Sequence, residues 1–235
     1  MQTTYGEKLK ETTIPKYHKA LKAIINKAKN EELLDKDLDA YKDIKTSAKA
    51  GEREYLDEHE IILFEDVEIE NDNWSLTASK DIFLMSVYTG LRYSDIVKIN
   101  SETVHFDNNG DIHISLVSEK TGKPFRINLH DFFNVEGQHH SRPELIILKY
   151  KDKLFANPFK LSAAYHNRNL KEIAKLAKIN KHLTSHIARH TFGTFMASRV
   201  NQFTLKELMQ HDKIETTSIY VHMASMDKEI EGIKW

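Results

Sequence analysis

The residues best suited to chemistry lie between His186 and His222, in the segments HIARHTFGTFMASRV and MQHDKIETTSIYVH. His186 and Arg189 are three residues apart, so on a helix they share one face and can reach one ligand. The planar guanidinium of arginine and the N–H of histidine both suit a phosphate group. A tyrosine hydroxyl brought to the same phosphate, here that of Tyr220, is a nucleophile. These residue types therefore predict phosphoryl transfer.

Two more basic residues stand at places suited to binding an anion. Arg92 follows the helix end expected at Gly90, in TGLRYSDI, and Asp95 begins the next helix. An arginine at such a corner can be held by a neighbouring carboxylate. Lys120 lies in the turn SEKTGKP between two alternating segments, an exposed place from which it can reach into a DNA groove.

The composition excludes several kinds of protein. With 235 residues and 40% hydrophobic residues the chain can bury one good core, with room for a small appendage. It has no cysteine, which rules out disulfides, thiolate nucleophiles and cysteine-ligated zinc. No apolar run is long enough to span a bilayer, and MQTTYGEKLKETT lacks the hydrophobic region of a secretory signal. We therefore expect a cytoplasmic protein of bacterial or phage type, associated with the nucleoid if it binds DNA.

The charge distribution reconciles a net charge of -1 with an anionic partner. Residues 51–75 hold ten acidic residues against one basic residue, Arg53, so the remainder of the chain is mildly basic. This basicity is modest, and we expect weak binding to DNA without further domains or partners.

Hydrophobic periodicity predicts mainly helices with a small antiparallel sheet, an α+β fold. Residues 14–30 form an amphipathic helix, and residues 31–57 read as a charged linker. Residues 111–117 and 125–129 alternate as a β-hairpin. Further helices are expected near residues 56–69, 75–91, 143–153, 162–178 and 184–199. Thr204 and Glu207 have the spacing of a capping box, and a last short helix is expected to hold Tyr220.

A metal site is the main alternative interpretation of the histidines. His182, His186 and His190 recur every four residues, a spacing that suits zinc. Arg189 would repel a cation there, and Thr184 is expected to cap the helix, which leaves His182 outside it. We therefore predict no metal and no cofactor.

Five separated motifs together resemble the catalytic domain of the tyrosine recombinases, the phage integrase family. They are TGLRYSDI, SEKTGKPFRINL, HIARHTFGTF, LMQH and TTSIYVH, with nine residues from His211 to Tyr220. Any one of them is weak evidence, whereas five in the family's order are strong. The resemblance runs from about Gly51 to Val221. It implies a catalytic domain with its C-terminal tail over residues 51–235, and the end of a helical core-binding (DNA-binding) domain plus linker over residues 1–50.

The resemblance also implies roles for six residues. Tyr220 would attack the scissile phosphate to give a 3′-phosphotyrosyl link, while Arg92 and Arg189 stabilise the charge of the transition state. His211 would donate to the same phosphate. Lys120 would protonate the leaving 5′-oxygen, and His186 would accept the proton of Tyr220. The phosphodiester energy stays in the phosphotyrosine, so this chemistry needs neither ATP nor a metal.

Two positions directly adjoin these residues, Gln210 before His211 and His190 after Arg189. The family usually has glycine before the histidine of its third motif, where this chain has Gln210. If that backbone needs a glycine-type conformation, glutamine costs about 1 kcal/mol or more. His190 is common in the family, and we assign it to structural support rather than to chemistry.

The resemblance implies a site-specific DNA recombinase or integrase, and we expect it to come from a mobile element. Its partner would be double-stranded DNA, on which four protomers assemble, with weak association or a monomer otherwise and no membrane. A type IB-like topoisomerase and a non-catalytic DNA-binding module of the same fold are the alternatives. The tail after Tyr220 is expected to pack either on its own domain or on a neighbouring protomer.

Overall fold

The computed structural model describes residues 13–37, 53–70, 73–134 and 138–232, with only the backbone of Met223 and of residues 225–232. The chain divides into two compact units, Met1–Glu52 and Arg53–Trp235. Within the described residues, no helix combines the length and the apolar character needed to cross a membrane. The predicted linker lies partly outside the described residues, since residues 38–52 are not among them.

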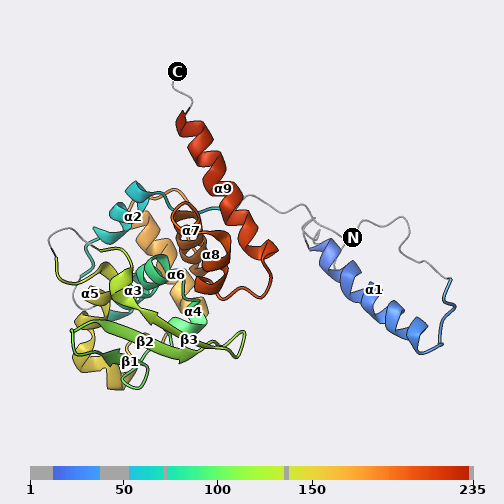
Figure 1. Cartoon of the computed structure of the whole chain (residues 1–235), viewed down its shortest axis with the longest axis horizontal. Coiled ribbons are helices and arrows are strands. Elements are labelled where there is room, and N and C mark those ends of the chain that lie inside the picture. Colours follow the sequence, from blue (N-terminus) through green and yellow to red (C-terminus); the bar gives the residue numbers. More distant parts are fainter. Residues whose placement is uncertain (1–12, 38–52, 71–72, 135–137, 233–235) are drawn as a thin grey trace. The chain divides into compact units, whose positions relative to one another are not determined.

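The first unit contains helix α1, Ile14–Asn30, as its sequence periodicity predicts (Figure 1). Pro15 stands in the first turn, where its missing N–H costs nothing, and two lysines lie in the last turn. None of its residues is buried, and Tyr17, Leu21 and Ile24 are at least half exposed. By itself this helix has no core.

The second unit packs helices around α3, with a small sheet along one side (Figure 1). Helix α3, Trp74–Thr89, is apolar on nearly all faces and contacts α5, α6 and α7, which explains its burial. The helices are α2 (Glu58–Glu65), α3, α4 (Tyr93–Ile96), α5 (Arg142–Lys149), α6 (Ala163–Leu176), α7 (Ser185–Ala197), α8 (Gln202–Leu208) and α9 (Glu215–Gly232), with 3₁₀ turns η1 (Leu129–Asp131) and η2 (Lys151–Ala156).

The sheet has three antiparallel strands in the order β1 (Val104–Phe106), β2 (Ile112–Val117) and β3 (Pro124–Asn128). Ile114 faces Val104 on one side and Ile127 on the other, and all three are buried. This register places the apolar face of the predicted hairpin on the core. The hairpin and the mainly helical fold class are confirmed, and β1 is a strand that the sequence pattern did not indicate.

Two local predictions were wrong. Helix α8 begins before Thr204, because the Asn201 side chain caps it by accepting from the backbone N–H groups of Phe203 and Thr204, each at 3.0 Å. Because this asparagine cap comes three residues before Thr204, the Thr204–Glu207 spacing lies inside the helix. The helix holding Tyr220 is also not short, since α9 continues to Gly232.

Candidate active site

Arg92 is positioned by the way helix α3 ends. Gly90 adopts a left-handed φ of 68°, and a Cβ there would lie 2.4 Å from the Phe192 ring, so glycine is required on two grounds. The turn brings Arg92 to the start of α4, where Nη2 donates to the Gln210 carbonyl at 3.1 Å and Nη1 lies 4.0 Å from Asp95. Asp95 is completely buried and also accepts from the backbone N–H of Glu119 at 2.9 Å. The neighbouring carboxylate predicted for Arg92 is therefore present.

Arg189 lies on α7 and is 7% exposed. Its guanidinium donates to the carbonyls of Gly90 and Met209, so it joins the end of α3 to the end of α8. Burial, with the charge of Arg92, lowers the pKa of Arg189 to about 10, which leaves it protonated at neutral pH. The two arginines thus converge on one place, each held by backbone carbonyls.

His211 is placed by the end of helix α8. The N–H of Gln210 donates to the Glu207 carbonyl at 2.9 Å and that of His211 to the Lys206 carbonyl at 3.0 Å. This pair of bonds is a Schellman motif, whose position after the cap takes a left-handed conformation. Gln210 has a φ of 48°, so the glycine-type backbone considered for this position is present.

The ionisation of His211 follows from its surroundings. Burial and the nearby charges of Arg189 and Arg92 lower the pKa of His211 to about 4, so it is neutral at pH 7. Its Nδ1 lies 2.9 Å from the hydroxyl of Thr217, which is fully buried. If Thr217 donates to Nδ1, the proton of the neutral ring resides on Nε2, which can then donate to a ligand.

Tyr220 lies on α9 and is 2% exposed. Its hydroxyl is 2.7 Å from Nδ1 of His190, and its ring is nearly parallel to that of His211, with centroids 6.1 Å apart. Gly193 makes room for the ring, because a Cβ at that position would lie 2.8 Å from it. Burial raises the pKa of Tyr220, while Arg189 and Arg53 oppose that rise.

Lys120 and His186 occupy more open positions. Lys120 is exposed in the hairpin turn, close enough for its charge to lower the pKa of His211, after the larger effects of burial and the two arginines. Lys123 of the same turn pairs with Asp212 at 3.1 Å, which ties the hairpin to the residue after His211. His186 is exposed one turn before His190, with ring centroids 6.5 Å apart.

Of the six residues predicted for the site, the structure gathers Arg92, Arg189, His211 and Tyr220 and leaves Lys120 and His186 at its edge. From the sequence we expected His190 to have a structural role only, but His190 contacts the hydroxyl of Tyr220. The sequence motifs did not indicate Gly193, Thr217 or Arg53 as site residues. For Arg53 a signal existed, since it is the single basic residue in the acidic stretch 51–75.

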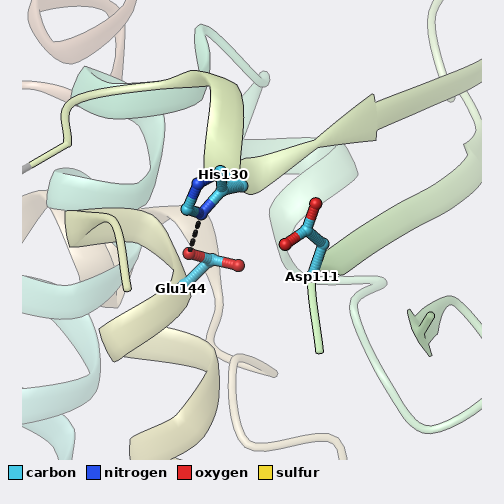
Figure 2. A group of neighbouring side chains, drawn as sticks. All are labelled: Asp111, His130 and Glu144. Atoms are coloured by element: carbon cyan, nitrogen blue, oxygen red, sulfur yellow. Dashed lines mark hydrogen bonds and ion pairs between the residues drawn. The ribbon is translucent and has the colours of Figure 1, made fainter. Parts of the chain in front are cut away.

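A separate cluster could be mistaken for a metal site. Asp111, His130 and Glu144 offer ligand atoms within 4.8 Å of one another (Figure 2). Glu144 is fully buried, but its oxygens already accept from Ser141 N at 2.8 Å and Ile112 N at 3.2 Å. It also pairs with His130 at 3.2 Å, and this hydrogen bond raises the pKa of His130. A capping box and an ion pair therefore account for the cluster.

The fold and the site together define a class, the catalytic domain of a tyrosine recombinase. Solved structures share the fold at low identity. An integrase of the transposon Tn1549 bound to a circular intermediate DNA matches with a TM-score of 0.62 and 17% identity, over 90% of this chain and 75% of that one. A lambda integrase tetramer bound to a Holliday junction matches with a TM-score of 0.63 and 14% identity, over 85% and 56%.

The chain belongs to the phage integrase family, whose model matches residues 55–226. It is 32% identical over 159 residues to tyrosine recombinase XerA of Saccharolobus solfataricus, covering 67% of this chain and 50% of XerA. It is 27% identical over 154 residues to XerC of Chlamydia pneumoniae, covering 62% and 47%. The chain thus spans about half the length of these relatives.

Proposed function

We propose that this protein is a site-specific DNA recombinase or integrase that cleaves and rejoins strands through a 3′-phosphotyrosyl intermediate. The observation that carries the proposal is the convergence of two backbone-held arginines, a neutral histidine and a buried tyrosine on one place. Arginine forks and imidazole N–H groups suit the non-bridging oxygens of a phosphodiester. The tyrosine supplies the nucleophile.

The proposed reaction balances without an external energy source. The Tyr220 oxygen bonds to phosphorus as the bond from phosphorus to the 5′-oxygen breaks, and the 5′-oxygen takes a proton from Lys120. Arg92, Arg189 and His211 stabilise the charge that develops on the non-bridging oxygens. Family resemblance assigns the tyrosine proton to His186. The geometry favours His190, which burial keeps neutral by lowering its pKa to about 4.

The proposal also covers the assembly of the protein on DNA and its place in the cell. The relatives act within larger chains, and one structural neighbour is a tetramer on a Holliday junction. We propose that four protomers assemble on two duplexes, with a core-binding domain represented in part by residues 1–50. We further propose that the protein comes from a mobile element and acts on bacterial DNA in the cytoplasm, at the nucleoid.

Covalent trapping tests this function. The protein is incubated with pooled DNA fragments from its source organism. Some fragments are nicked so that a cleaved piece diffuses away and the covalent intermediate accumulates. After denaturation, the amount of protein that migrates with DNA is measured. We expect adducts that survive EDTA and vanish with Tyr220→Phe, and sequencing of the trapped DNA would identify the site. If the protein binds these fragments but gives no adduct with any of them, it is a DNA-binding module rather than an enzyme.

Topoisomerase activity is the second candidate, because the same tyrosine chemistry relaxes one strand. The distinction between the two activities rests on assembly. A recombinase requires protein–DNA complexes of four protomers, whereas a monomer that relaxes supercoiled plasmid without strand exchange would establish the topoisomerase.

A further inference from the structure

Gln210 occupies a backbone position that disfavours it. It is the residue after the cap of helix α8, with a φ of 48° and the two hydrogen bonds of a Schellman motif. Glycine is preferred there because it has no Cβ to meet the backbone in the left-handed conformation. Lys178 has the same place after α6, with a φ of 56° and bonds from Lys178 N to Lys175 O and from Ile179 N to Ala174 O.

The side chains of these two residues meet different surroundings. That of Lys178 is exposed, so its charge stays in water. The amide of Gln210 is shielded from solvent, and neither Nε2 nor Oε1 has a hydrogen-bond partner among the residues that the structure describes. An unpaired buried amide destabilises a fold, and the left-handed backbone adds to that cost. A glycine would remove both costs, so the fold gives no reason for glutamine at this position.

The unpaired amide belongs to the segment on which the site is built. The Gln210 carbonyl accepts from Arg92, and the preceding carbonyl, that of Met209, accepts from Arg189. His211 follows directly. A strained residue with an unpaired amide, next to His211 and to the carbonyls that hold the two arginines, points to a ligand that completes it.

We propose that Gln210 is a phosphate-binding residue of this site, whose Nε2 donates to an oxygen of the DNA phosphate held by Arg92 and Arg189. This inference rests on the proposed function, because it assumes that the site takes a phosphodiester. An amide is a neutral donor, so it adds a contact without further lowering the pKa of His211 or of Arg189.

Two substitutions at Gln210 and one matched control test the proposal. Gln210→Gly removes the amide and the backbone cost, while Gln210→Met removes only the amide and keeps the unbranched length. Lys178→Gly removes the same backbone cost at the equivalent position of α6. The probe is inorganic phosphate at constant ionic strength, with chloride as the balancing anion, and the readout is the unfolding midpoint Tm against phosphate concentration.

We expect Gln210→Gly and Lys178→Gly both to raise Tm in the absence of phosphate. Phosphate affinity should fall roughly tenfold in both Gln210 variants, the effect of one lost hydrogen bond to a charged group, and should not change in Lys178→Gly. If Gln210 had only a structural role, the Gln210→Gly protein would gain stability without losing affinity for phosphate.

The outcomes distinguish a failure of the Gln210 proposal from a failure of the proposed recombinase function. If the wild type binds phosphate and the Gln210 variants bind it equally well, the Gln210 proposal is overturned and the proposed function stands. If the wild type shows no phosphate-dependent Tm, the Gln210 proposal is overturned as well, and Tyr220-dependent adducts then decide the proposed function independently.

Discussion

Nδ1 of His190 lies 2.7 Å from the hydroxyl oxygen of Tyr220, at hydrogen-bonding distance between α7 and α9. The side chains lie thirty residues apart in sequence, and Gly193, one turn after His190, leaves the space that the tyrosine ring fills. The proposed nucleophile is therefore buried, oriented and in contact with a neutral base.

This contact predicts which histidine handles the proton of Tyr220. We expect His190→Gln to slow formation of the covalent adduct by about 100-fold or more, since glutamine can hydrogen-bond but cannot take a proton. His186→Gln is the matched variant one turn away, and its loss should be smaller. Single-turnover adduct formation on the DNA recovered by trapping measures both. A greater loss in His186→Gln would return the role to His186.

Thr217 should determine which nitrogen of His211 carries the proton. Thr217→Val keeps the shape of the buried side chain and removes the hydroxyl next to Nδ1, so both tautomers of His211 become populated. We expect about tenfold slower adduct formation. Thr216→Val, at an exposed position, is the control. Nitrogen NMR of the His211 ring reads the tautomer directly, and an unchanged spectrum in Thr217→Val would contradict the assignment.

Gly193 should be intolerant of any side chain. In Gly193→Ala the new Cβ would lie 2.8 Å from the Tyr220 ring, and the helix backbone leaves the methyl no other direction. We expect a loss of about 1–3 kcal/mol in the free energy of unfolding, together with a displaced tyrosine and weaker adduct formation. Ser198→Ala, exposed near the end of the same helix, should change neither quantity by much. Full activity in Gly193→Ala would show that the ring is not confined.

His166 should make the fold sensitive to acid. It is fully buried against Tyr93, and within the described part of the chain neither ring nitrogen has a hydrogen-bond partner. Burial lowers its pKa from 6.5 to about 4. At this position the unfolded chain therefore binds a proton more readily than the folded protein. His166 has no effect on stability above about pH 6.5, and it lowers the free energy of unfolding as the pH drops from 6.5 towards 4.

Replacing this histidine should remove that part of the acid sensitivity. His166→Phe keeps the ring stacked on Tyr93 and cannot be protonated. We expect it to preserve on the order of 2 kcal/mol of stability near pH 4.5, from about 1.4 kcal/mol per pKa unit, with little change at pH 8. Urea unfolding at the two pH values is the measurement. Equal losses in wild type and variant would assign the acid sensitivity to other groups, His190 and His211 first.

The sequence by itself predicted the type of most elements and the candidate residues of the site. Period and alternation are local properties, so α1, α3, α7 and the β2–β3 hairpin were readable from side-chain spacing. The positions of Arg92, Lys120, His186, Arg189, His211 and Tyr220 followed from five motifs. The unusual Gln210 was also visible, because the family that the motifs resemble usually has glycine before the histidine of its third motif.

The tertiary structure decided which of these residues meet. Sequence spacing places His186 and His190 on one face of α7, but only the packing of α9 brings Tyr220 to His190 rather than to His186. The contact of Thr217 with His211 depends on how α9 follows the end of α8, and the need for glycine at position 193 depends on the tyrosine ring that fills its space. Such contacts join residues through packing between elements, and local periodicity carries no information about them.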